Sequence, residues 1–161
     1  LDTAAVEQAM TRLRRWDRRD PGDGSAERVE PLKRELRKLM EDHCSVFRTD
    51  AVMREGVEKL GQLRERLNRA VIADQSSTFN TARVEAMELE NLMDCASATI
   101  HSALGREESR GAHSRVDFPD RDDQRWMRHS LYSLVDDSLD YKPVRTRPNT
   151  VASFPPKERV Y

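Results

Sequence analysis

Residues 108–123 read ESRGAHSRVDFPDRDD. This stretch has a high density of both charges, with one glycine, one histidine and one proline at defined places among them. An amphipathic helix repeats its apolar residues every three or four positions, and this stretch does not. A plain solvated linker has no need of such an order of residue types. Residues 108–123 are therefore the most specific signature in the chain.

This segment resembles a part of the flavoprotein subunit of succinate dehydrogenase and fumarate reductase, near its C-terminus. Further matches occur in the family's order and cover about residues 40–161: Ser45–Thr49, Arg64–Leu67, Phe79–Thr81 with Arg83–Glu85, Glu88–Leu89, Asn91–Met93, and Phe154–Lys157 with the terminal Tyr161. Residues before 40 and the stretch 134–153 match more loosely. The resemblance implies a parent subunit that transfers hydride between succinate and FAD, then passes electrons to an iron–sulfur subunit and a quinone.

The family places its flavin-binding and substrate-binding residues upstream of the matching segment. The resemblance therefore implies no catalytic, cofactor-binding or metal residue in this chain, and FAD belongs to the remainder of the subunit. The implied partners are the flavin-binding part of the same subunit, the iron–sulfur subunit and a flavinylation assembly factor. The implied location is peripheral, on the cytoplasmic face of a bacterial inner membrane or the matrix side of the mitochondrial one. The chain begins with Leu1 rather than Met, which favours a piece of a longer protein.

Composition narrows the function classes. The 161 residues contain 28 Lys and Arg against 29 Asp and Glu, so no net field attracts nucleic acid or an anionic membrane surface. A content of 37% hydrophobic and 35% charged residues predicts one lean domain that depends on a neighbour. No run approaches the ~20 apolar residues that span a bilayer, so direct membrane insertion is not expected. Cys44 and Cys95 are far apart in sequence and are expected to be reduced thiols.

Apolar residues at three- and four-residue steps predict four helices. Asp2, Thr49 or Asp50, and Asn80 or Thr81 are candidate N-caps, and Pro31 suits a first helical turn. Gly105 is expected to end the last helix in a left-handed conformation. The expected buried stripes are Val6, Ala9, Met10, Leu13 and Trp16; Leu32, Leu36, Leu39, Met40, His43 and Phe47; Met53, Val57, Leu60, Leu63 and Leu67; and Val84, Met87, Leu92, Met93, Cys95, Ala96, Thr99, Ile100 and Ala103.

After Gly105 the pattern changes. Partial period-two alternation over 126–135 and again over 139–144 predicts a β-hairpin, whose aromatic residues would cover a helical layer. Four prolines in the tail predict an extended chain. The expected fold is mainly α: a three- to four-helix antiparallel bundle over residues 1–104, then a charged docking segment, a small hairpin and a Pro-containing tail over 105–161. Both parts belong to one structural domain of a larger subunit.

No glycine-rich nucleotide loop, P-loop, GxSxG or HExxH motif is present in the sequence. His43 and His101 lie in helical patterns, where a structural histidine is the commoner case. His113 is crowded by arginines, which favour a neutral imidazole that hydrogen-bonds a carboxylate or a backbone carbonyl. We therefore expect a structural role for His113 and not general acid or base catalysis.

The arginines of the signature have two possible uses. Guanidinium groups can clamp a dicarboxylate, but four aspartates lie near enough in sequence to pair with them internally. We expect an internal network that docks this segment against the flavin-binding part of the subunit, with Gly111 allowing a tight turn. Its expected members are Arg110, Gly111, His113, Arg115, Asp117, Arg121, Asp122 and Asp123.

Three alternatives stay open at this point. The parent enzyme could work mainly as a fumarate reductase. It could also be an L-aspartate oxidase, a relative that shares the helical C-terminal arrangement. The missing catalytic motifs would also suit a stand-alone helical interaction module. In every case the chain alone is expected to be inactive.

Overall fold

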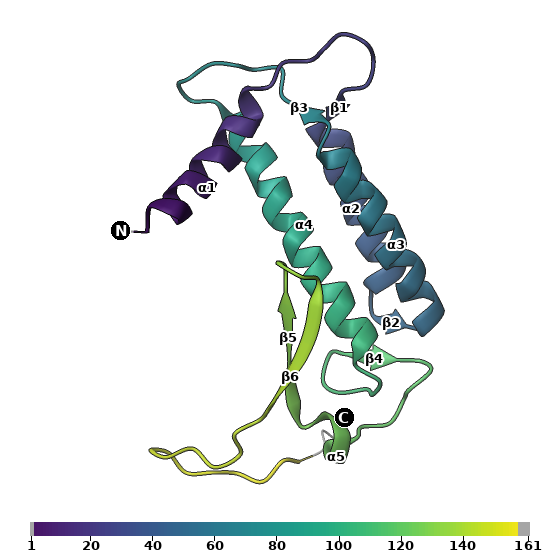
Figure 1. The fold of residues 1–161 in the computed structure, drawn as a ribbon. Coiled ribbons are helices and arrows are strands. Elements are labelled where there is room, and N and C mark those ends of the chain that lie inside the picture. Colours follow the sequence, from purple (N-terminus) through teal and green to yellow (C-terminus); the bar gives the residue numbers. More distant parts are fainter. Residues whose placement is uncertain (1, 158–161) are drawn as a thin grey trace.

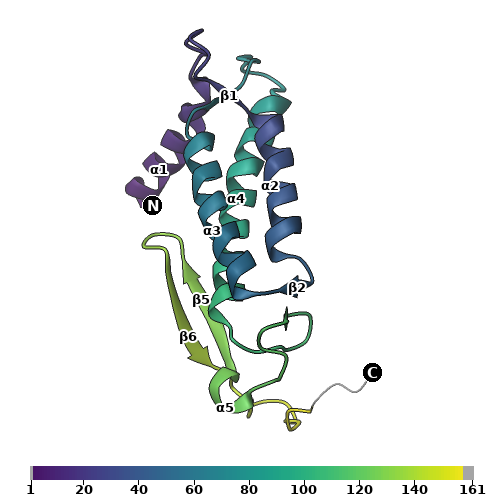
Figure 2. The same cartoon turned by 90° about the vertical axis from the view of Figure 1, so that its right-hand side faces the viewer.

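The computed structural model describes residues 2–157, so Leu1 and Tyr161, which the sequence comparison used, lie outside the described residues. Three long helices lie side by side in both views (Figures 1 and 2). They are α2 (Val29–Cys44), α3 (Asp50–Leu67) and α4 (Thr81–Gly105). A shorter helix, α1 (Thr3–Arg14), continues into a 3-10 turn, η1 (Arg15–Asp17), beside the start of α4 (Figure 1). The mainly helical class is confirmed.

The described residues also form three small two-stranded sheets. Two are parallel pairs of two-residue strands, β1 (Glu27–Arg28) with β3 (Ala70–Val71) and β2 (Phe47–Arg48) with β4 (Ser114–Arg115). After the short helix α5 (Asp123–Trp126), the expected hairpin is present as β5 (Arg128–Ser133) antiparallel to β6 (Ser138–Pro143). The hairpin lies along the second half of α4 (Figures 1 and 2).

Side-chain caps begin three of the helices, at the positions that the sequence indicated. Asp2 accepts a hydrogen bond from the Ala4 amide at 3.0 Å, and Thr49 accepts one from the Val52 amide at 3.4 Å. Asn80 accepts from Arg83 N at 2.7 Å. Each cap satisfies one of the amides that a helix leaves unpaired in its first turn.

The core is formed mainly by α2, α3 and α4. The buried apolar residues of these three helices are Leu32, Leu36, Leu39, Cys44, Met53, Leu60, Leu63, Leu67, Ala86, Leu89, Met93, Ala96, Ile100 and Ala103. Several expected members are wrong: Phe47 is 76% exposed, Val84 56% and Leu92 44%, and Cys95 and Thr99 are also exposed. Phe47 lies in β2, outside α2, so the helical period does not apply to it. α4 buries the face of Leu89 and Met93. The helical period places Val84 and Cys95 on the opposite side of this helix and Leu92 at the edge of the buried face.

The first helix differs most from its expectation. α1 has no buried residue, and its apolar stripe is exposed, with Val6 at 50% and Met10 at 39%. Trp16 alone of the expected stripe is buried, and it belongs to η1. Ion pairs hold this region to α4, because Arg12 and Arg15 both contact the Glu90 carboxylate.

Gly105 is the last residue of α4, and it has no positive φ, so the expected left-handed cap is wrong. The glycine is needed for close packing instead. A Cβ at this position would lie 2.4 Å from Cδ2 of Leu139 and 3.0 Å from the Tyr141 hydroxyl, both in the hairpin. Gly105 therefore lets β6 pass close to the end of α4.

Within residues 2–157, no helix is long and apolar enough to cross a bilayer.

Candidate functional site

The charged signature lies at the C-terminal end of α4, where β4 and α5 approach the helix (Figure 1). Arg115 is the centre of one half of this site and is 1% exposed. Its Nη1 donates to the carbonyls of Ala103, Leu104 and Arg106 at 3.3, 3.0 and 3.3 Å. The last four carbonyls of a helix have no partner within the helix. Arg115 therefore caps the end of α4.

Asp117 connects this cap to a second helix. Its carboxylate accepts two hydrogen bonds from Arg115, each of 2.8 Å, in the bidentate geometry that guanidinium favours. The same carboxylate accepts from the amide of Asp50 at 2.7 Å, the first residue of α3. The hydrogen bonds from Arg115 hold the pKa of the Asp117 carboxyl well below its usual range. The pair therefore joins the C-terminal end of α4 to the N-terminal end of α3.

Glu108 is the centre of the other half and is 0% exposed. Its carboxylate contacts Arg106 at 2.5 Å and Arg110 at 2.9 Å, and it also accepts from the Asp122 amide at 2.9 Å. Burial by itself would raise the pKa of Glu108, but the hydrogen bonds from these partners outweigh burial and lower it. A buried carboxylate is tolerated only with such partners.

Arg110 extends this half outward. It pairs with Asp123 at 2.6 Å, and Arg121 pairs with the same carboxylate at 2.7 Å. The hydrogen bonds from Arg121 and Arg110 lower the pKa of Asp123 to about 2. Backbone hydrogen bonds of 2.8 and 2.9 Å between Arg110 and His113 enclose a two-residue turn. Gly111 has φ +58° in that turn, a left-handed conformation that glycine adopts without strain.

His113 joins the two halves. Its Nε2 donates to the Arg106 carbonyl at 3.1 Å, and its Nδ1 accepts from Arg48 Nη1 at 2.8 Å. Burial is the main cause that lowers the pKa of His113, and the neighbouring cations Arg48, Arg115 and Arg106 lower it further. The imidazole is therefore neutral near pH 7, as the sequence indicated, and both of its nitrogens are used within the chain.

The structure brings most of the predicted site residues together, but not all of them form ion pairs. Asp122 caps α5 by accepting from the amides of Gln124 and Arg125. Sequence reasoning missed Arg48, Arg106 and Glu108 as members. Glu108 opens the signature and Arg106 precedes it by two residues, so their position was a usable signal. Arg48 lies 65 residues from His113, and only the β2–β4 pairing brings it close.

Tyr132 and Tyr141 of the hairpin pack against α4, together with Trp126, which ends α5 and lies before the hairpin, contrary to the expected start of the strand at 126. Trp126 is 2% exposed and lies edge-on to Tyr141, with ring centroids 5.4 Å apart. The Tyr141 hydroxyl donates to the Gly105 carbonyl at 3.0 Å. Tyr132 packs on His101 of α4 at 5.1 Å. Trp126 and Tyr141 therefore cover the end of α4, whereas Tyr132 and His101 also line a cavity of about 410 Å³ between α3, α4 and the hairpin.

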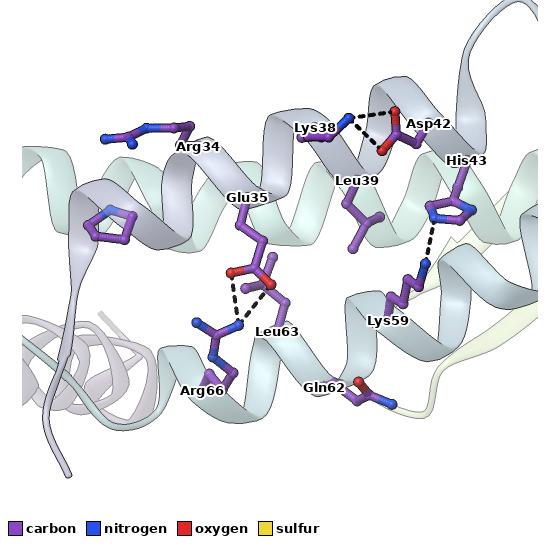
Figure 3. Close-up of a pocket in the computed structure, with 11 residues that line it drawn as sticks. Arg34, Glu35, Lys38, Leu39, Asp42, His43, Lys59, Gln62, Leu63 and Arg66 are labelled. Atoms are coloured by element: carbon purple, nitrogen blue, oxygen red, sulfur yellow. Dashed lines mark hydrogen bonds and ion pairs between the residues drawn. The ribbon is translucent and has the colours of Figure 1, made fainter.

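A groove also lies between α2 and α3, away from the charged network (Figure 3). It has a volume of about 540 Å³, and Leu39 and Leu63 lie among the charged residues that line it. Arg66 contacts both oxygens of Glu35 at 2.8 Å, and the Lys59 ammonium lies 3.2 Å from Nε2 of His43. Lys38 pairs with Asp42 at 2.9 Å. Among residues 2–157, no group of three His, Cys, Asp or Glu side chains is placed to hold a metal ion.

Comparison with known proteins gives the family. Residues 33–161 match the family described as fumarate reductase flavoprotein C-term, which is most of the chain. The chain belongs to this family. The resemblance expected from the signature is therefore confirmed, and the network at the end of α4 lies within the matched residues.

Relatives of the flavoprotein family match almost the whole chain. The succinate dehydrogenase flavoprotein subunit of Coxiella burnetii is 44% identical over 96% of this chain, which corresponds to 25% of the relative. The fumarate reductase flavoprotein subunit of Mycobacterium tuberculosis is 36% identical over 99% of this chain and 27% of the relative. A structure of Escherichia coli quinol fumarate reductase covers 99% of this chain at a TM-score of 0.81 and 33% identity, and 26% of that chain is covered. The chain thus spans about a quarter of the length of the relatives that it matches.

Proposed function

We propose that this chain is the C-terminal part of a flavoprotein subunit that oxidises succinate to fumarate. In the proposed enzyme, hydride passes to FAD, and the electrons then pass to an iron–sulfur subunit and a quinone. The observation that carries this proposal is the identity to succinate dehydrogenase flavoprotein subunits along nearly the whole chain. Fumarate reduction is the second candidate, because relatives with that name also match at high coverage.

Within that enzyme, the chain supplies packing and not chemistry. Support comes from the network, in which the carboxylates of Glu108, Asp117 and Asp123 each pair with an arginine of the same chain. Paired, buried charges are suited to holding a surface in place. We propose that residues 105–161 dock on the flavin-binding part of the subunit and that residues 1–104 brace them from behind. FAD and the substrate would then bind outside this chain.

The proposed partners follow from the same assignment. The flavin-binding part of the subunit is the first, and the iron–sulfur subunit is the second. A flavinylation assembly factor is a further predicted partner. The proposed location is peripheral, on the cytoplasmic face of a bacterial inner membrane or the matrix side of the mitochondrial one.

One gel on the native source tests the central proposal. An antibody against this chain and a flavin-fluorescence image should detect the same band, at a mass several times that of the chain. The purified protein from that band should oxidise succinate with an artificial electron acceptor, and the reverse rate with fumarate decides between the two directions. An antibody-positive band at the mass of this chain, with no flavin, would contradict the assignment.

A mutation separates docking from substrate binding. Arg110→Ala in the intact subunit removes a partner of Glu108 and of Asp123, so assembly and stability of the subunit should fall. The KM for succinate of the fully flavinylated fraction should stay close to that of the wild type. An unchanged stability with a large rise in KM would instead place Arg110 at the substrate.

A further inference from the structure

The β2–β4 pair has two different faces. Its register is Phe47 opposite Ser114 and Arg48 opposite Arg115. Successive side chains of a strand point to opposite faces, so Arg48 and Arg115 share one face and Phe47 and Ser114 the other. Arg115 is 1% exposed, whereas Phe47 is 76% exposed. The pair therefore has an inner face of charge and an outer face that begins with an exposed aromatic ring.

A second apolar residue lies on that outer face. The Val116 amide donates to the Arg48 carbonyl at 2.8 Å, and the alternation of side chains places Val116 on the same face as Phe47. Val116 is 60% exposed. We call these two residues, Phe47 and Val116, the apolar patch.

The patch is held in place from behind. On the inner face, the Arg115 guanidinium caps α4 and pairs with Asp117. Arg48 is fixed by its hydrogen bond to His113. The buried charges thus support two strands of only two residues each, which present apolar side chains outward.

Such a face is unusual on a finished surface. Parallel strands occur almost only where both faces are covered by other elements. Contiguous exposed apolar side chains are typical of contact sites, whereas single scattered ones are ordinary on a protein surface. Other highly exposed apolar side chains, such as Phe79 at 96% and Val135 at 98%, lie in a loop and in the hairpin turn instead.

We propose that the apolar patch is the surface on which the upstream, flavin-binding part of the same polypeptide docks, and that the charged network is its inner framework. The inference rests on the proposed function and refines it in two ways: the contact is made by the patch and not by the charges, and it includes Phe47, which lies outside residues 105–161. The occupant follows from the comparisons. The matched family is the C-terminal part of a flavoprotein, and this chain spans about a quarter of its relatives, so the remaining chain lies upstream.

Photo-crosslinking in the intact subunit tests the contact directly. We would prepare Phe47→p-benzoyl-phenylalanine and, as a second position, Val116→p-benzoyl-phenylalanine. Val135→p-benzoyl-phenylalanine is the control, because this side chain is even more exposed but lies in the hairpin turn. Mass spectrometry of the purified subunit should find crosslinks from both patch positions to peptides upstream of this chain. The yield from each patch position should exceed that of the control roughly tenfold.

Four outcomes would overturn the inference: crosslinks only to a second copy, only to the iron–sulfur subunit, only to residues 144–157 of the same chain, or none above the control. A second measurement covers variants that fold poorly. Phe47→Asp in the intact subunit should increase proteolysis between the two parts roughly tenfold, and Val135→Asp should not. Flavin content is read separately. A subunit without flavin that still crosslinks upstream would refute the proposed activity and leave the docking surface standing.

Discussion

Two regions of this molecule use arginine, lysine and carboxylates, but they place the charges in different surroundings. In the network at the end of α4, the side chains of Glu108 and Arg115 are both 0% exposed. In the groove between α2 and α3, Lys38 is 74% exposed and its partner Asp42 is 46% exposed. Water already solvates the groove charges well, whereas the network charges depend on each other.

This difference shows which ion pairs contribute most to the stability of the fold. Exposed ion pairs contribute about 0–1 kcal/mol, because water and salt screen them. Removal of one partner from a buried pair costs about 3–5 kcal/mol, because the other charge is left uncompensated. The largest effects of mutation on stability are therefore expected in the network and not in the groove.

Glu108→Gln should have the largest effect. The substitution keeps the shape of the side chain but leaves Arg106 and Arg110 without their shared buried carboxylate. The local free energy of unfolding should fall by about 3–5 kcal/mol. Hydrogen exchange of the last turn of α4 in the intact subunit measures this loss.

The matched control is Asp42→Asn in the groove, which should cost less than about 1 kcal/mol. Equal losses of protection for the two variants would remove the distinction between the regions. A large loss from Asp42→Asn alone would reverse it.

Arg115→Lys should rank second. Lysine keeps the charge but cannot contact Asp117 with two nitrogens and reach the α4 carbonyls at the same time. A cost of about 2 kcal/mol is expected, since hydrogen bonds to charged groups contribute about 1.5–3 kcal/mol. Arg125→Lys is the control, because its pair with Glu107 is 56% exposed on the arginine side. Thermal unfolding of both variants should separate them, and similar melting temperatures would argue against the cap.

The third prediction compares two glycines of α3. A Cβ at Gly56 would lie 2.5 Å from Cβ of His43 and 2.7 Å from Cδ1 of Ile100, whereas a Cβ at Gly61 meets nothing within 4 Å. Gly56→Ala should destabilise the protein by about 1–3 kcal/mol through overpacking. Gly61→Ala should stabilise it by about 0.5–1 kcal/mol through helix propensity. Denaturant unfolding of both variants checks the opposite signs, and a stabilising Gly56→Ala would show that the helices have room to move apart.

These glycines also show how far the sequence could predict the fold. Helical period and cap residues located α2, α3 and α4, because both signals are local. The sequence treated Gly56 and Gly61 alike, because their difference arises from α2 and α4 passing close to only one of them. The expectation that the apolar stripe of α1 is buried was wrong for a related reason. An amphipathic pattern shows that a face is apolar, but not whether something in the same chain covers it.

The sequence could predict many of the residues that belong to the network, but not most of the pairs that these residues form. The spacing of Arg115 and Asp117 indicated pairing within the signature, and the structure has that pair. The partners of Glu108 follow from the folding of the segment onto itself, which residue types alone do not determine. Arg48 reaches His113 only through a parallel pairing of two-residue strands, and such short strands have no alternation to detect.

The smallest predicted effect concerns pH and His113. Burial and the adjacent cations lower its folded-state pKa, so the folded protein favours the neutral imidazole. The unfolded chain has the ordinary histidine pKa of about 6.5. The contribution of His113 to stability is therefore complete above pH ~6.5 and is lost as the pH falls from there toward the folded-state pKa. Protection of the β2–β4 amides in the intact subunit, corrected for intrinsic exchange, should decrease over that interval.

His113→Gln identifies the titrating group. A glutamine amide can still donate to the Arg106 carbonyl and accept from Arg48, but it has no proton to gain in this range. Its protection should change less with pH than that of the wild type. Asp117 cannot produce the same curve, because its pKa lies well below this interval. Parallel curves for wild type and His113→Gln would therefore show that another group causes the pH dependence. The hydrogen bonds of His113 between the two halves of the network would then not change with pH in this range.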